Sequence, residues 1–357
     1  MKIAIVGCGA IGGYVGARLA LAGEDVTFLV RGANLAAVRC DGITLLMNGT
    51  RQVARNVTAT DDYAAAGPQD LVILAVKAHQ LEAVATRVAH LFGRDTVVVT
   101  MQNGIPYWYF HRHGGELAGS IVRSVDPNGR ITELIPGERV IGCVVYPAAE
   151  LVAPGVVHHI EGERFPVGEL DGSNSERVQR VSQCLTRAGF KSPVLEDIRA
   201  EIWLKLWGNL TFNPISALTR STLVDICQFP ATRQLAAAMM LEAQEVAAKL
   251  GIVFRVGLEK RIAGAERVGK HKTSMLQDLE AGRAPELEAL VGSVMELGRL
   301  TGTRTPHIDT VYGLTHLLAR TVAAPQGDSA AASERFPGAP GRIAASPERS
   351  AAPPAHA

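Results

Sequence analysis

IAIVGCGAIG, residues 3–12, is the stretch that decides the fold class of this chain. Its first part, Ile3–Val6, is a short apolar run that suits a buried parallel strand. The six residues that follow have the pattern G-x-G-x-x-G: Gly7, Cys8, Gly9, Ala10, Ile11 and Gly12. Between a strand and a helix, this pattern is typical of the turn that holds the pyrophosphate of a dinucleotide. A glycine-rich turn without a ligand is the alternative interpretation.

The three glycines have separate roles in such a turn. Gly7 permits the tight turn, Gly9 leaves room for the pyrophosphate against the backbone, and Gly12 allows close packing of helix and strand. The following helix, expected over 13–22, presents free N–H groups and the positive end of its dipole to the anion. We therefore expect the six residues of the turn to bind the cofactor.

Strand and helix patterns alternate along the rest of the first half. Apolar runs predict strands at 25–30, 70–76 and 96–100, and further candidate strands lie at 141–146 and 156–160. Such alternation indicates βαβ units in a doubly wound parallel sheet, with the ligand at the carboxyl ends of the strands.

The second half changes character. A helix is expected at 178–188, and longer helical patterns cover roughly 196–220, 230–250, 285–301 and 306–321. The predicted fold class is therefore α/β, an N-terminal Rossmann doubly wound sheet with a mostly α-helical C-terminal domain. We place the domains at 1–175 and 176–322. Residues 323–357 are rich in Ala, Pro, Ser and Gly, and we expect them to be disordered.

The composition excludes several function classes. Lys and Arg number 36 against 35 Asp and Glu among 357 residues, so no global field attracts nucleic acid or a membrane surface. No apolar run approaches the roughly 20 residues of a membrane span, and the first residues do not resemble a secretory signal. Five cysteines without CxxC spacing suit a reducing compartment, and we expect a cytoplasmic protein. The paired histidines at 111/113 and 158/159 lack acidic or thiol partners at ligand spacing, so no metal site is expected.

Arg31 follows the second strand, at the position that usually determines whether such a site binds NADH or NADPH. An acidic residue usually follows the second strand in sites that bind NAD, but this chain has Arg31 directly after residues 25–30. A guanidinium can pair with a 2′-phosphate, which favours NADPH over NADH. A solvated surface arginine is the alternative. Lys77 and Asn103 also follow strands of the sheet, and by position each is either a cleft contact or an ordinary loop residue.

The segment EIWLKLWGNLTFNPI, residues 201–215, carries the catalytic candidate. Lys205, Asn209 and Asn213 are spaced by four residues and so lie on one stripe of a helix, among apolar neighbours. Pro214 is expected to end or kink that helix. The alternative is a lysine that reaches water while the asparagines satisfy a loop.

The motif Lys205-x3-Asn209-x3-Asn213-Pro214 closely resembles the signature helix of the ketopantoate reductase family. The glycine turn, Arg31, Lys77 and Asn103 match that family in order, and so does the later stretch 272–278 followed by Glu286. The resemblance covers roughly residues 1–320. It implies NADPH-dependent reduction of 2-dehydropantoate to (R)-pantoate, a step of pantothenate and coenzyme A synthesis.

The resemblance also implies roles for single residues. Lys205 is expected to be the general acid, with a pKa lowered by Trp203 and Trp207. Substrate contacts are expected from Asn209, Asn213, Ser274, Glu286 and Asn103, with Ser274 on the carboxylate and Glu286 on the hydroxyl. Lys77 and Asn103 are expected to face the nicotinamide end of the cleft.

Two stretches depart from the family pattern. In residues 286–291, ELEALV, Glu288 is a longer acid than the Asp expected there, and Ala289 and Val291 lack polar groups. Residues 107–113, YWYFHRH, form an aromatic and basic loop. A related reductase of another 2-keto acid therefore stays open, as do a β-hydroxyacid or opine dehydrogenase and a non-catalytic NADPH-binding regulator. A homodimer and a monomer fit the sequence equally well.

Overall fold

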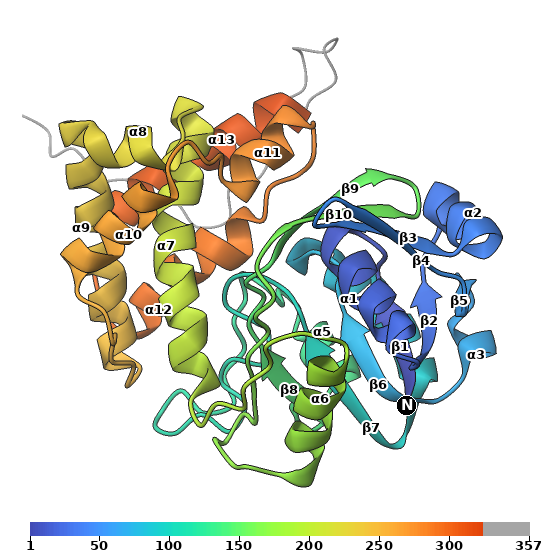
Figure 1. Cartoon of the computed structure of the whole chain (residues 1–357). Coiled ribbons are helices and arrows are strands. Elements are labelled where there is room, and N and C mark those ends of the chain that lie inside the picture. Colours follow the sequence, from blue (N-terminus) through green and yellow to red (C-terminus); the bar gives the residue numbers. More distant parts are fainter. Residues whose placement is uncertain (324–357) are drawn as a thin grey trace, which may run out of the picture. The chain divides into compact units, whose positions relative to one another are not determined.

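The computed structural model describes residues 1–323, which form one compact unit (Figure 1). The predicted fold class is confirmed: a parallel sheet with helices is followed by a helical C-terminal part. The division near residue 175 stays a prediction. The tail expected to be disordered lies outside the described residues, apart from Ala323, which ends a helix.

The main sheet has seven strands in the order β11-β8-β7-β6-β1-β2-β5. All pair in parallel except β11 with β8. Because the chain runs outward in one direction from β1 and then returns to add β6 on the other side, the switch point of the sheet lies between these two strands, where ligands of such folds bind. The strands are β1 (Lys2–Val6), β2 (Asp25–Leu29), β5 (Val57–Thr60), β6 (Gln69–Leu74), β7 (Phe92–Thr100), β8 (Val140–Cys143) and β11 (Val167–Gly168).

A second sheet, which the sequence did not predict as such, packs over helix α1 (Ala10–Leu21). Its order is β4 (Thr50–Ala54), β3 (Ile43–Met47), β10 (Val156–Glu161) and β9 (Ala148–Ala153). Gly13 and Gly16 let the layers approach: a Cβ at Gly13 would meet Val157, and one at Gly16 would meet Phe28 of the main sheet. Helix α1 is therefore held between two sheets, which fixes the glycine turn at its start.

The helical part surrounds the long helix α7 (Ile198–Thr219), which packs against α9, α11 and α13 (Figure 1). Pro214 lies inside α7 and does not end it, contrary to one of the two expectations. An interior proline removes one backbone hydrogen bond and crowds the preceding turn, but buried packing on both flanks holds the helix together. The other helices here are α8 (Leu223–Gln228), α9 (Pro230–Lys249), α10 (Leu258–Val268), α11 (Ser274–Glu280), the π-helix η4 (Glu288–Gly292), α12 (Ser293–Leu300) and α13 (Pro306–Ala323).

Helices also flank the main sheet: α2 (Gly32–Asp41), α3 (Tyr63–Ala66), α4 (Leu81–Val88), α5 (Arg130–Leu134) and α6 (Glu176–Arg187), with short 3-10 turns at Ala78–Gln80, Ala89–Leu91 and Gly137–Arg139. In the described part of the chain, no helix combines the length and the apolar character that crossing a membrane requires.

The aromatic loop 107–113 joins the first half of the chain to α7. The side chains of Tyr109 and Phe110 are fully buried. The hydroxyl of Tyr109 accepts a hydrogen bond of 2.7 Å from Nε1 of Trp203, and the backbone carbonyl of Tyr109 accepts one of 2.8 Å from Arg199. The loop therefore anchors the first turns of α7.

Candidate active site

The glycine turn lies at the carboxyl end of β1. Gly7 has φ of +99°, a conformation that favours glycine, and its N–H donates to the carbonyl of Leu29 at 3.1 Å. A Cβ at Gly12 would clash with the carbonyl of Gly7 and lie 3.0 Å from the Cβ of Ala75. A Cβ at Gly9 would meet nothing within 4 Å. Gly7 and Gly12 are thus required by the packing, whereas Gly9 faces open space where a pyrophosphate would fit.

A cavity of about 490 Å³ adjoins this turn. Its lining includes Gly7, Cys8 and Gly9 together with Arg31, which is exposed at the start of α2. Arg87, from α4, contributes a second guanidinium to the same cavity. Two cations beside a glycine turn suit an anionic dinucleotide with an additional phosphate. Arg87 was not predicted, because sequence spacing does not reveal that α4 faces the end of β2.

Cys8 is a buried filler of the turn. Only 3% of its surface is exposed. Burial raises the pKa of its thiol to about 12. Its place beside a helix N-terminus would by itself lower the pKa, but desolvation outweighs that effect here. Cys8 is therefore protonated and unreactive at neutral pH.

The ammonium of Lys205 donates hydrogen bonds to two oxygens of the Rossmann part. It donates to Oδ1 of Asn103 at 2.6 Å and to the backbone carbonyl of Val145. Asn103 follows β7, and its neighbour Gln102 donates to the carbonyls of Leu74 and Val76 at 2.8 and 2.9 Å. These bonds tie the end of β7 to the end of β6, so Asn103 presents its amide to Lys205 from a braced loop.

Burial lowers the pKa of Lys205 to about 8, and the negative charge of Glu286 partly opposes that effect. The direction of the shift and desolvation as its cause agree with the sequence prediction, but the groups that lie next to the ammonium differ from those expected. Side chains two positions away on a helix point roughly 160° from Lys205, and the indoles of Trp203 and Trp207 donate to Tyr109 and to the carbonyl of Met240. The groups around the ammonium are instead Val145 and the ring of Tyr146, whose centroid is 5.9 Å away.

Glu286 completes a chain of polar groups with Asn103 and Lys205. Its Oε1 accepts from the backbone N–H of Ala78 at 3.1 Å, and its Oε2 lies 3.4 Å from Nδ2 of Asn103. A close backbone approach holds this arrangement: Ile105 N–H donates to the carbonyl of Ala289 at 2.9 Å, and a Cβ at Gly104 would press on Ala289. Glycine at 104 is what this close approach to the backbone of Ala289 requires.

The remaining predicted substrate residues line the same helix and the start of α11. Asn213 is buried, and its Nδ2 lies 3.5 Å from Oγ of Ser274, which is exposed at the first position of α11. Asn209 is half-buried one turn beyond Lys205. The structure thus brings Asn213 to Ser274 and Lys205 to Asn103 and Glu286.

Lys77 makes an ion pair that the sequence did not suggest. Its Nζ lies 2.6 Å from Oδ2 of Asp278 on α11, and Oδ1 of Asp278 accepts from Nε of Arg283 at 2.9 Å. The partner could not be found from spacing, because 201 residues separate the pair.

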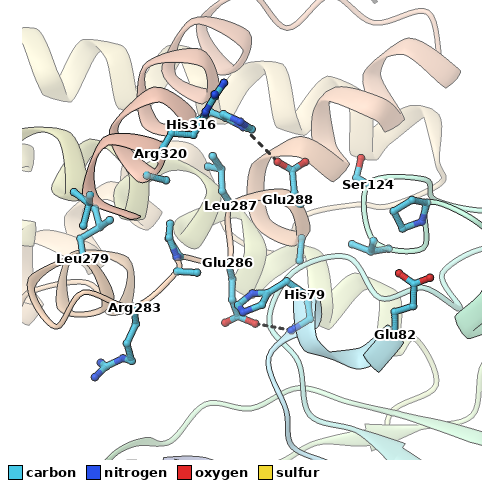
Figure 2. A pocket seen from close by; sticks show the side chains of 18 of the residues that line it. His79, Glu82, Ser124, Leu279, Arg283, Glu286, Leu287, Glu288, His316 and Arg320 are labelled. Atoms are coloured by element: carbon cyan, nitrogen blue, oxygen red, sulfur yellow. Dashed lines mark hydrogen bonds and ion pairs between the residues drawn. The ribbon is translucent and has the colours of Figure 1, made fainter. Parts of the chain in front are cut away.

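A larger cavity of about 540 Å³ lies beside the site. Its lining includes residues 282–289 and the end of α13, but not Lys205, Asn209 or Asn213. Figure 2 shows Glu286 and Glu288 turned to opposite sides: Glu286 toward His79, and Glu288 toward His316. Glu288 accepts from Tyr312 at 2.7 Å and lies 3.7 Å from His316. In the described residues, no group of three or more His, Cys, Asp or Glu could hold a metal ion.

Comparisons with protein families agree with this geometry. Residues 3–172 match the family described as Ketopantoate reductase PanE/ApbA, and residues 197–319 match its C-terminal counterpart. A 2-dehydropantoate 2-reductase of Mesorhizobium japonicum is 52% identical over 320 residues, which cover 89% of this chain and 98% of the relative. One of Archaeoglobus fulgidus is 31% identical and covers 84% of this chain and 92% of that one.

Solved structures give the same relationship. A structure assigned as a ketopantoate reductase from Ralstonia solanacearum MolK2 superimposes with a TM-score of 0.86 at 44% identity. The match covers 90% of this chain and 98% of that one. A D-mandelate dehydrogenase structure at 22% identity shares the fold, with a TM-score of 0.78 and coverage of 91% and 100%.

Proposed function

Because this chain belongs to the ketopantoate reductase family, we propose that it reduces 2-dehydropantoate (ketopantoate) to (R)-pantoate with NADPH. The observation that carries this proposal is the contact of Lys205 with Asn103, which sets an ammonium at the carboxyl edge of the cofactor sheet. The alternatives without catalysis do not require a lysine of lowered pKa at that place.

NADPH, when bound, supplies a hydride to the keto carbon of the substrate. Lys205 donates the proton that the carbonyl oxygen needs, and its charge stabilises the alkoxide as it forms. Glu286 accepts a hydrogen bond from the hydroxyl of the substrate, and Asn209, Asn213, Ser274 and Asn103 orient it. The carbonyl gains one hydride and one proton, which gives the alcohol.

The cofactor site fits the residues present. The turn from Gly7 to Gly12 would hold the pyrophosphate, with open space at Gly9. Arg31 would pair with the 2′-phosphate, and Lys77 would stand near the nicotinamide end of the cleft.

The decisive experiment is a panel of 2-keto acids assayed by NADPH oxidation, with ketopantoate among them. We expect ketopantoate to give the highest kcat/KM, and Lys205→Ala to lower kcat by about 10²–10⁴-fold while NADPH still binds. A variant that kept turnover within tenfold of the wild type would rule out Lys205 as the general acid. Preference for another 2-keto acid would make the chain a related reductase.

We also propose that the protein is a cytoplasmic homodimer. Leu314 and Leu317 are 54% and 61% exposed on one face of α13, and Leu241 on α9 is 54% exposed. Exposed leucines of this kind suit association with a second copy. Four buried free cysteines suit a reducing compartment. Light scattering on the purified protein and fractionation of cells would test the two statements.

A further inference from the structure

Arg261, on α10, is a mostly buried cation that the proposed mechanism does not use. Its Nε is buried and has no hydrogen-bond partner among the described residues. Burial lowers the pKa of its guanidinium. A cation withdrawn from water is costly unless an anion or several acceptors compensate it, so an arginine in this position calls for an anionic partner.

The guanidinium lies against α7 at Gly208. Its Cζ is 2.9 Å from the place that a Cβ at Gly208 would occupy, so any larger residue there would displace it. Glycine inside a helix destabilises it relative to alanine. Gly208 stands three residues after Lys205 and directly before Asn209, which places it on the Lys205 face of α7. The helix therefore makes room for Arg261 within one turn of the general acid.

The buried carboxylate of α7 is already engaged. Glu201 is 1% exposed and binds Arg164 and Arg255 through ion pairs. Its Oε1 also accepts from the hydroxyl of Tyr146 at 2.7 Å. Both oxygens of Glu201 thus have cationic partners, and among residues 1–323 no carboxylate forms an ion pair with Arg261.

We propose that Arg261 binds the carboxylate of the 2-keto acid and makes the enzyme selective for anionic substrates. The inference rests on the proposed function. In a 2-keto acid the carboxylate is bonded to the keto carbon, so it must lie close to the ammonium that protonates the keto oxygen. Arg261 packs on α7 at Gly208, within one turn of Lys205. Ser274 can add a neutral hydrogen bond, but a guanidinium supplies both charge and a two-pronged donor.

The test compares two ligands that differ in charge and little in shape. Pantoate and its neutral primary amide are titrated by calorimetry into the protein saturated with NADP⁺. We expect the wild type to bind pantoate about 10–100-fold more tightly than the amide. In Arg261→Met this ratio should fall toward one while the affinity for the amide stays within about threefold. Arg261→Lys should retain part of the ratio, because it keeps the charge but loses the fork.

Arg267→Met is the matched control, since Arg267 is exposed on the same helix. Gly208→Ala is an independent probe that should mimic Arg261→Met by pushing the guanidinium aside. If Arg261→Met does not fold, Gly208→Ala tests the same proposal. Equal weakening of pantoate and amide in Arg261→Met would mean a structural role and overturn the proposal, as would an unchanged ratio. If the wild type bound neither ligand and did not reduce ketopantoate, the proposed function itself would fail.

Discussion

Lys205 and Asn103 are 102 residues apart in the chain, yet the ammonium of the first donates to Oδ1 of the second at 2.6 Å. One residue comes from the long helix of the C-terminal part, and the other from the loop after β7. The amide of Asn103 faces Glu286 at its other end. A single asparagine thus connects the proposed proton donor to the proposed substrate carboxylate partner.

The pH dependence of reduction should report the titration of Lys205. Its pKa is about 8, and only the protonated form can give a proton to the carbonyl. We therefore expect kcat to be level below pH 8 and to fall about tenfold per unit above it. The measurement is kcat for ketopantoate and NADPH between pH 6 and 10. A profile that stays flat through pH 10 would contradict both the lowered pKa and the role.

Glu286→Gln should shift that profile to lower pH. The carboxylate raises the pKa of Lys205 against the effect of burial, so its removal lets the pKa fall further. The KM for ketopantoate should also rise, because the amide is a weaker acceptor for the hydroxyl. Glu288→Gln is the control, since Glu288 contacts Tyr312 on the other side of the segment. An unshifted pH profile in Glu286→Gln would mean that the charge of Glu286 does not act on the pKa of Lys205.

Local signals in the sequence predicted much of this architecture. The glycine turn, the strands around it and the stripe of Lys205 are set by neighbours within a few residues, so periodicity and spacing reveal them. The hairpin of β3 and β4 also has a local signal in the sequence. Asn48 and Gly49 join these strands with φ of 51° and 72°, the left-handed conformations that favour an Asn-Gly turn.

Contacts between distant segments could not be predicted in this way. The parallel pairing of β10 with β3 joins Val156 to Thr44, and no local pattern specifies it. The sequence predicts that the neighbouring tryptophans desolvate Lys205. Val145 and Tyr146, which contact its ammonium from the sheet side, cannot be found from local spacing. The helical stripe of Lys205 is visible in the sequence, whereas its surroundings depend on the tertiary fold.

Arg31→Ala should change the choice of cofactor. Arg31 lines the cavity beside the glycine turn and has no role in the core, because it is exposed. Loss of a charge-assisted contact of about 1.5–3 kcal/mol should lower kcat/KM for NADPH by roughly 10–100-fold. The value for NADH should stay within about threefold. Arg51→Ala, at an exposed site on β4, is the control.

An unchanged ratio of kcat/KM for NADPH to kcat/KM for NADH in Arg31→Ala would mean that another residue selects the cofactor. Arg87 is then the candidate, because it lines the same cavity and stacks over the ring of Tyr63 at 4.5 Å. The double variant would show whether the two guanidiniums act on the same phosphate.

Asp278→Asn should loosen the contact between the sheet and α11. The substitution keeps the shape of the side chain but removes the charge that holds Lys77 at 2.6 Å. Because the pair is only partly buried, we expect a loss of about 1 kcal/mol in the free energy of unfolding. The KM for ketopantoate should rise, since Asp278 also binds Arg283 near the segment that carries Glu286. Glu280→Gln, also on α11, breaks an exposed ion pair with Lys272, which precedes the helix, and should change neither quantity beyond error. If both variants had the same unfolding free energy and the same KM, the Lys77–Asp278 pair would be an ordinary surface contact. The position of Glu286 would then depend on the packing of Gly104 against Ala289 alone.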